Sequence, residues 1–481
     1  MTSTFFGLEI TRRALASQQA ALDVTGNNIS NANTEGYTRQ MANLKETTPY
    51  TIYATGRNLS LGSGVSMDTV TRARDKFVDM ELRDETSKQQ YWTSRQTSLS
   101  NIESFMNEPS NNGLSAAMDN FWTAWSSLSQ DPGNTGARSV VQGRAITLTD
   151  SFHAIAQQIK TMQSNLNSDV TTQIQKINSY ADQIAKLNDQ IKSAKITGDN
   201  PNDLLDSRDN LIDKLSKIVN VKVSETNDDF SISIGGDVPP ATLVDNGTAN
   251  HLDETSGLDG NDVKWESGDS LTLNPQQGTL QADIQVRDTD LNNLLDQYNS
   301  LAKDIVGAVN SIYGTGKVTG STATGNTFFD PSNLTASTIS LTSTGSAPVD
   351  DSVPTNINNI VTGDGTSGDG SIAAAIAALA TGWSSITDTS LTSKASSLGD
   401  EYGVIVSQFG VQVQQTNQTK AGEDVLVNNL TNQRDSVSGV SLDEEMTNMI
   451  QYQKSYMAAA RVVTTMDDML STIVTGLGVT R

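Results

Sequence analysis

Apolar residues recur every seven positions at both ends of the chain. The first stripe comprises Leu8, Leu15, Leu22 and Ile29, and the last comprises Leu442, Met449, Tyr456, Val463, Leu470 and Leu477. A companion row, Tyr452, Ala459, Met466 and Ile473, follows the last stripe at a spacing of three, and Glu445 interrupts it. Because a narrow seven-residue seam favours a partner helix over a broad core, the two ends are predicted to pair as one assembly interface. The alternative, that both stripes face ordinary cores, stays open.

An asparagine-rich stretch follows the first stripe. Residues 27–40 read NNISNANTEGYTRQ. Asparagine side chains compete for backbone hydrogen bonds, and glycine reaches turn conformations that other residues resist. The stretch therefore predicts a helix stop and an elbow, with Asn31, Asn33, Gly36 and Tyr37 as its turn residues.

Helical periodicity also dominates the interior. Over residues 152–196 the apolar stripe runs from Phe152 to Leu166 and restarts at Val170, a four-residue step that locally unwinds a supercoil. At about 1.5 Å per residue this helix would be roughly 65 Å long. A second seam covers 280–312, and weaker helical patterns cover 70–106 and 395–435.

Strand signals are confined to short stretches. Alternating apolar residues flank a polar turn within 219–236, which predicts a hairpin, and Asn246-Gly247 is a typical two-residue turn. Residues 314–371 are rich in Gly, Ser, Thr and Asp. With few apolar residues, this insertion is expected to form loops that bury little area.

These patterns predict a mainly α fold, an elongated rod of long helices with a discontinuous terminal coiled-coil domain and small β-hairpin and loop-rich insertions. The terminal domain would combine residues 1–45 with 438–481. The expected order between them is a long-helix shaft over 46–218, a β-hairpin excursion over 219–275, shaft again over 276–313, a short polar insertion over 314–394, and a return helix over 395–437.

Composition excludes several function classes. The net charge of −23 repels nucleic acid and anionic lipid surfaces, so no nucleic-acid partner is expected. The absence of Cys excludes disulfides and thiol chemistry. No apolar run approaches the roughly 18 residues of a membrane span, and the N-terminus lacks the pattern of a cleavable signal peptide.

No catalytic, cofactor or metal site stands out. His153 and His251 are the only histidines, and neither belongs to a ligand motif. The Asp/Gly-rich stretch 362–371 is a single copy without a calcium-binding rhythm, which favours a flexible loop. The aromatic cluster FWTAWSSL, beginning at Phe121, is expected to pack in a core rather than to stack a ligand.

Both ends of the chain resemble a known family. ALDVTGNNISNANTEGYTRQ looks like the N-terminal signature of the flagellar rod, hook and hook-associated axial proteins, and SGVSLDEEMTNMIQYQKSYMAAARVVTTMDDML resembles their C-terminal counterpart. In the interior, NNGLSAAMDNFWTAWSSLSQDP, LLDSRDNLIDKLSKIVNVKV and QGTLQADIQVRDTDLNNLLDQYNSLA are similar to segments of the FlgK-type hook-associated protein 1 family. Residues 314–395 depart from that family, which often has a sizeable β domain there.

The resemblance implies a structural, non-enzymatic adaptor between the flagellar hook and filament. It implies extracellular location at that junction after uncleaved export through the flagellar type III pathway. The implied partners are other copies in a homo-oligomeric ring, the hook protein, the second hook–filament junction protein, and an export chaperone on the C-terminal region. The paired end helices would line the inner tube and become ordered on assembly.

Other readings remain open from the residues alone. The chain could be another axial protein of the hook or rod type, or a secreted helical adhesin or translocator. An enzyme with paired carboxylates hidden in the β excursions would need two carboxyl groups about 5 to 10 Å apart in a concave pocket.

Overall fold

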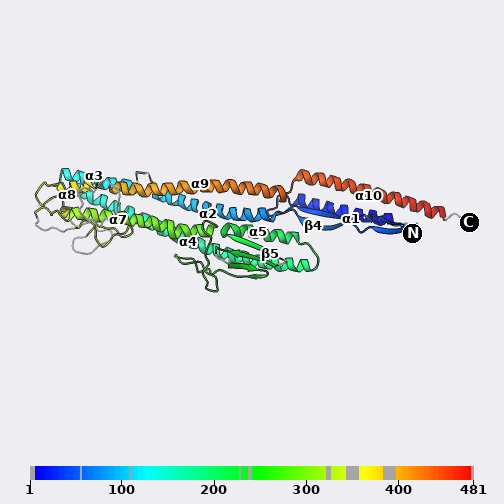
Figure 1. The fold of residues 1–481 in the computed structure, drawn as a ribbon. Helices are drawn as coiled ribbons and strands as arrows, with labels where there is room; N and C mark the ends of the chain where they lie inside the picture. The colour runs from blue at the N-terminus through cyan, green and yellow to red at the C-terminus, as the bar shows by residue number, and fades with distance from the viewer. Residues whose placement is uncertain are drawn as a thin grey trace.

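The molecule is an elongated, mainly helical rod, which confirms the predicted fold class (Figure 1). The computed structural model describes residues 6–54, 57–108, 110–111, 113–226, 229–236, 241–258, 260–320, 327–342, 357–382 and 397–477. The N- and C-terminal helices lie side by side at one end of the rod, so the two ends of the chain meet at one tip.

The described helices carry the length of the rod. They are α1 (Phe6–Ser30), α2 (Lys76–Met106), α3 (Leu114–Gln130), α4 (Thr135–Ile196), α5 (Asn202–Ile218), α6 (Thr279–Gln285), a π-helix (Val286–Asp290), α7 (Leu291–Tyr313), a 3-10 helix (Ile357–Asn359), α8 (Ser371–Ala378), α9 (Leu398–Ser438) and α10 (Leu442–Leu477). Side-chain caps begin several of them: Asp75 accepts hydrogen bonds from the Phe77 and Val78 amides of α2, and Asn134 accepts one from Ala137 of α4.

The strands form small antiparallel sheets. They are β1 (Gln40–Glu46), β2 (Tyr50–Ala54), β3 (Arg57–Leu61), β4 (Val65–Arg72), β5 (Val221–Thr226), β6 (Asp229–Ile234), β7 (Ala241–Asp245) and β8 (Thr248–Ala249). β1 pairs with β4, β2 with β3, and the last four form one sheet in sequence order. The expected hairpin within 219–236 is β5–β6, and Asn246, with φ 52°, turns β7 into β8.

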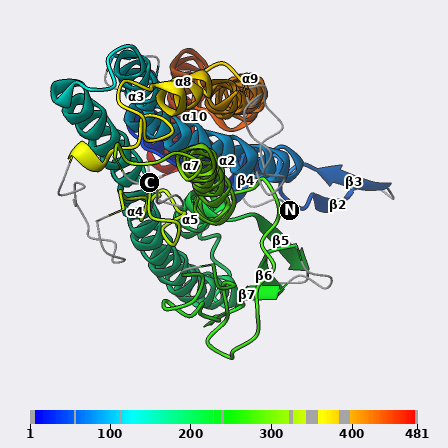
Figure 2. The same ribbon diagram turned by 90° about the vertical axis from the view of Figure 1, so that its left-hand side faces the viewer.

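The prediction that a helical shaft begins at residue 46 is wrong. Residues 46–72 belong largely to β1–β4, and the shaft begins at Lys76 of α2. In Figure 2, β2 and β3 extend away from the helices as a separate arm. The sequence did not predict these strands because β1, QMANLKE, is mostly polar. Much of its length is exposed to solvent, so it lacks a clear alternation of apolar and polar residues.

Two apolar cores follow each other along the rod, and α4 belongs to both. Its buried residues as far as Leu166 pack in the first core, and those from Val170 onward pack in the second. The break in the α4 apolar stripe, read from the sequence at 166–170, therefore marks the change from one set of packing partners to the other.

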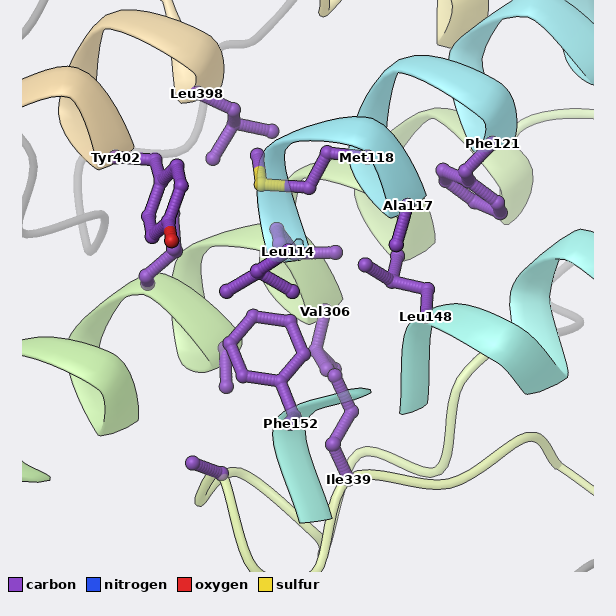
Figure 3. Close-up of a cluster of buried hydrophobic side chains, with 14 of the residues drawn as sticks. Leu114, Ala117, Met118, Phe121, Leu148, Phe152, Val306, Ile339, Leu398 and Tyr402 are labelled. Carbon is purple, nitrogen blue, oxygen red and sulfur yellow. The ribbon is translucent and has the colours of Figure 1, made fainter. Parts of the chain in front are cut away.

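The first core lies at the rod end opposite the chain termini. Helices α3, α4, α7 and α9 meet there around Leu114, Phe152, Val306 and Leu398 (Figure 3). Within the predicted aromatic cluster, Phe121 and Trp125 are fully buried, so the expectation of core packing is confirmed.

The insertion over 314–394 buries more than expected in its described parts. The hydrophobic residues Phe328, Phe329, Ile339, Ile360 and Val361 belong to the first core, each 0–2% exposed. A few aromatic and branched residues are enough to anchor a polar loop in a core. The average composition of the insertion, which is polar, did not reveal them. The stretch 362–371 is ordered as well, because the Asp369 carboxylate accepts backbone hydrogen bonds from Asp364 and Ser371.

The second core joins the lower half of α4 and α5 to the β5–β8 sheet. Ile177, Ile184 and Ile212 from the helices pack against Ile232 and Val244 of the sheet. The sheet is thus a side layer on the helical rod rather than a separate rod segment.

A buried carboxylate lies where α6 crosses the shaft. Asp283 is 5% exposed and accepts hydrogen bonds from Ser94 Oγ of α2 (2.6 Å) and from Gln173 Nε2 of α4. Burial, with no cation hydrogen-bonded to this carboxylate among the described residues, raises the pKa of Asp283 to about 6. The π-helix follows directly, at Val286–Asp290.

The raised pKa of Asp283 predicts a specific pH dependence of stability. The favourable contribution of protonated Asp283 to folding stability is fully present below the ordinary carboxyl pKa of 3.8. It is lost as pH rises through about 6, because the fold disfavours only the ionised form. We expect Asp283→Asn to raise the free energy of unfolding at pH 7.5 by about 2–3 kcal/mol, with little effect at pH 4.

Thermal and urea unfolding at both pH values measure this difference. Asp296→Asn, an exposed carboxylate on α7, is the matched control and should change stability by less than about 0.5 kcal/mol. Equal effects of Asp283→Asn at the two pH values would contradict the assignment.

Candidate assembly site at the terminal helices and elbow

The terminal helices α1 and α10 lie against each other in antiparallel orientation (Figure 1). Two contacts fix their register. At the tip, Gly7 abuts Met466 so closely that a Cβ on residue 7 would lie 2.2 Å from the Met466 Cε atom. At the elbow, Asn28 Nδ2 donates a hydrogen bond to Glu445 Oε2 at 3.1 Å. The predicted pairing of the two ends is therefore present within one subunit.

The predicted seam residues are only partly covered in this pair. Leu8, Leu15, Leu22 and Ile29 are half-buried, as are Met449, Val463 and Leu470. Leu442 and Tyr456 are 49% and 36% exposed. The Leu477 side chain lies outside the described residues. A pair of helices alone leaves much of each seam open to solvent.

The most buried face of α1 is instead lined by small and polar residues. They are Thr11, Ser17, Ala21, Thr25 and Asn28. The Ser17 hydroxyl donates to the Val65 carbonyl of β4, so this face also contacts the β1–β4 hairpin. Small side chains allow α1 to fit closely between the hairpin and α10, and the leucine stripe is displaced toward the outside.

Asn28 is the centre of the elbow. Its side-chain oxygen accepts hydrogen bonds from Tyr37 Oη (2.8 Å) and the Gln40 amide (2.9 Å). Its Nδ2 donates to the Gln40 carbonyl (2.8 Å) and to Glu445. The residue is 1% exposed, so the four interactions satisfy every donor and acceptor of a fully buried amide. Asn28 thereby joins α1, the turn, β1 and α10.

The four predicted turn residues follow Asn28 in the elbow, and Tyr37 is the one that hydrogen-bonds to it. Gly36 has φ of 80°, and a Cβ there would lie 2.9 Å from Asn210 Nδ2 of α5, so this turn requires glycine. Asn31 Nδ2 donates to the Asn27 carbonyl, and Asn33 is exposed. Burial, with the carboxylates of Asp206, Asp203 and Glu445, raises the pKa of Tyr37 to about 12, so it remains a hydrogen-bond donor.

Helix α5 anchors the elbow to the shaft through its acidic face. The Thr38 amide donates to Asp206 Oδ2 and Gln40 Nε2 to Asp203 Oδ1, at 3.1 and 3.2 Å. Arg72, at the end of β4, forms ion pairs with both Asp206 and Asp209 at 2.8 Å.

Asp209 is shared by three arginines. Arg72, Arg74 and Arg83 lie 2.8, 3.0 and 3.4 Å from its carboxylate oxygens. Burial alone would raise the pKa of Asp209, but these guanidinium groups hold it below its ordinary value. The cluster extends through Asp213 to Arg434 of α9, at 3.4 Å. It therefore ties β4, α2, α5 and α9 into one joint.

Sequence reasoning missed Asn28, Glu445 and the α5 carboxylates. Glu445 was visible as the single charged residue in an apolar row, and it is 3% exposed. Asp203, Asp206, Asp209 and Asp213 fall at helical spacing on one face of α5, which is a readable signal. Their partners, however, lie more than a hundred residues away and cannot be identified without the fold.

The geometry of the terminal helices and elbow supports binding between helices. Within the described part of the chain, no group of three His, Asp or Glu residues is arranged to hold a metal ion. None of the described helices is long and apolar enough to cross a bilayer.

The role of Asn28 can be tested by truncating its side chain. Asn28→Ala leaves the Gln40 backbone groups and the Glu445 carboxylate without their buried partner. We expect the free energy of opening the α1–α10 pair to fall by about 3 kcal/mol. Amide hydrogen exchange in α1 and β1 measures it, with Asn33→Ala as the control, since this exposed asparagine should contribute less than about 0.5 kcal/mol. Equal effects of both substitutions would refute the central position of Asn28.

Three segments of the chain match described protein families. Residues 8–38 match the flagella basal body rod protein family, 99–329 match the flagellar hook-associated protein FlgK helical domain, and 431–476 match the C-terminal region of the flagellar basal body rod FlgEFG proteins. The two terminal matches cover α1 with the elbow and most of α10.

Curated relatives extend the similarity to the whole chain. Flagellar hook-associated protein 1 of Bacillus subtilis is 33% identical, over 100% of this chain and 99% of its own length. Flagellar hook-associated protein 1 of Escherichia coli is 27% identical, over 94% and 96% respectively. The structure of the flagellar hook junction protein FlgK from Burkholderia pseudomallei shares the fold, with a TM-score of 0.58 and 16% identity, covering 75% of this chain and 100% of that one. The chain therefore belongs to the flagellar hook-associated protein 1 family.

Proposed function

We propose that this chain is a structural adaptor that joins the flagellar hook to the filament. In this proposal the subunits assemble through their terminal helices after uncleaved export by the flagellar type III pathway. Family membership supports a structural role in the bacterial flagellum, and the terminal helix pair supplies the means of assembly.

The observation that carries the proposal is the surplus apolar surface of α10. Leu442, Met446, Ile450 and Met457 are 39–55% exposed along one flank of the helix that covers α1. Val462, Met469 and Ile473 are 44–63% exposed along the other flank. Exposed apolar stripes of this length mark a protein interaction site. Each α1–α10 pair is thus suited to pack between two neighbouring pairs.

Several finer partners follow as proposals. Copies of the chain would form a ring, in contact with the hook protein on one side and the second hook–filament junction protein on the other. An export chaperone would cover the exposed flanks of α10 before assembly. The tip at which both terminal helices end would face the inside of the tube. No enzymatic step is part of this function.

The competing readings fit less well. A hook-type axial protein would not need the interior helical segment 99–329, which matches a hook-associated helical domain. A secreted adhesin or translocator would not need the two terminal segments that match axial proteins of the flagellum.

A charge in the terminal seam should block assembly. Leu470→Asp places a carboxylate against α1 and neighbouring subunits, where desolvation opposes the charge. We expect cells carrying it to export the chain but to release their filaments, with at least a tenfold loss of attached filaments counted by electron microscopy. Thr472→Asp, on the polar face of α10 with Arg461 and Asp468, is the control and should leave attachment near normal.

Filaments that remain attached in cells lacking this chain altogether would refute the adaptor function. Normal attachment with Leu470→Asp would refute the role of the terminal seam in assembly but would leave the adaptor function standing.

A further inference from the structure

A polar groove lies at the joint between the terminal unit and the shaft. Its volume is about 800 Å³, and its walls come from the elbow, α2, α5, the end of α9 and the linker into α10. It runs beside the Asp209 cluster but is separate from the exposed flanks of α10. Nothing in the proposed packing of the terminal helices fills it.

The groove is basic in an acidic protein. Six cationic side chains and four carboxylates line it, whereas the chain carries a net charge of −23. Four of the cations, arginines, have carboxylate partners in the joint. Lys214 and Lys217 have no carboxylate within ion-pair distance among the residues described. The groove therefore offers two lysines to an acidic group from outside.

Two polar atoms of the lining also lack hydrogen-bond partners. They are Arg39 Nε and Ser438 Oγ. The two residues are neighbours, because the Arg39 amide donates a hydrogen bond to the Ser438 carbonyl. Both atoms are buried beneath the lining, so the two lysines are the polar groups that the groove presents to a partner.

The opposite face of α2 carries a complementary feature. Phe77 and Met80 are 67% and 51% exposed, and Glu81 beside them is exposed. At about 100° per residue, Phe77 points roughly 180° away from Thr86, which lines the groove. We call Phe77, Met80 and Glu81 the α2 knob. Knob and groove lie at the same level of the rod, since Arg74, Leu82 and Arg83 belong to the groove wall.

We infer that the α2 knob of one copy docks in the joint groove of the next copy. Different patches on opposite faces make a heterologous contact, which repeats from copy to copy around a ring or helix. Glu81 would pair with Lys214 or Lys217, and Phe77 and Met80 would pack on the half-buried Val427 and Val440 of the lining. This inference rests on the proposed function, because it requires copies to assemble side by side.

The contact would brace the joint from outside. The Asp209 cluster fixes the angle between terminal unit and shaft within one copy, and a neighbour seated in the groove would hold α2, α5 and α9 together. This contact would form a second lateral interface between copies, at the level of the elbow, in addition to the one proposed along α10.

Cysteine cross-linking tests the contact directly, because the chain has no Cys of its own. Glu81→Cys combined with Lys217→Cys in assembled flagella should give a ladder of covalent multimers with a short bismaleimide. Each single variant should give none beyond a dimer. Glu81→Cys with Lys186→Cys, an exposed lysine of α4, is the matched control and should give no ladder. No ladder in cells whose filaments remain attached would overturn the inference and leave the adaptor function standing.

Charge reversal provides the second measurement. Lys214→Glu with Lys217→Glu should lower filament attachment severalfold, and adding Glu81→Lys should restore at least half of it. These residues are on the surface, so circular dichroism should show unchanged folding. Failure of Glu81→Lys to rescue a correctly folded variant would also overturn the contact.

Discussion

The carboxylate of Asp209 holds the two parts of the molecule in one orientation. It lies within 3.4 Å of three arginines, which come from the end of β4, the following loop and α2. Removing one member of a buried ion cluster leaves the other charges without a partner. Such clusters are therefore costly to break even where they add little net stability. None of the apolar clusters among the described residues includes a side chain of α1 or α10. The joint is therefore held by directional polar contacts, which fix an angle, whereas apolar contact alone would allow the terminal unit to slide.

Along the shaft, the opposite principle applies. Two apolar cores succeed each other, and α4 passes from one to the other between Leu166 and Val170. A helix can serve two sets of partners only if its apolar stripe shifts to a new face, and the four-residue step does this. Near that crossing the shaft carries the buried Asp283, hydrogen-bonded to α2 and α4, followed by a π-helix. Apolar packing thus holds the helices together within each core, and polar contacts fix their arrangement where one core gives way to the next.

Periodicity in the sequence was enough to predict the long helices, their pairing at the chain ends and the elbow after Ile29. It failed where structure depends on partners distant in sequence. β1 and β4 are joined across the span of a second hairpin, and their exposed positions dilute the alternating pattern. Phe328 and Phe329 are two residues in a long polar stretch, yet they fill the first core. Asn28 was one of four similar asparagines, and only the fold shows that its amide, unlike that of Asn33, is buried against Glu445.

The buried Asn28–Glu445 pair at the elbow end of the α1–α10 contact has a physical consequence for assembly. Apolar seams tolerate sliding by one heptad, but a hydrogen bond between Asn28 and Glu445 is satisfied in a single register. The α1–α10 pair can therefore keep its register while its outer flanks remain apolar and exposed to neighbours. Polar contacts within the subunit set the register of α1 against α10. The exposed apolar flanks of α10, which are less specific, remain free for association between subunits. In the proposed assembly, a net charge of −23 opposes premature contact between copies in solution, so that association requires close apolar packing.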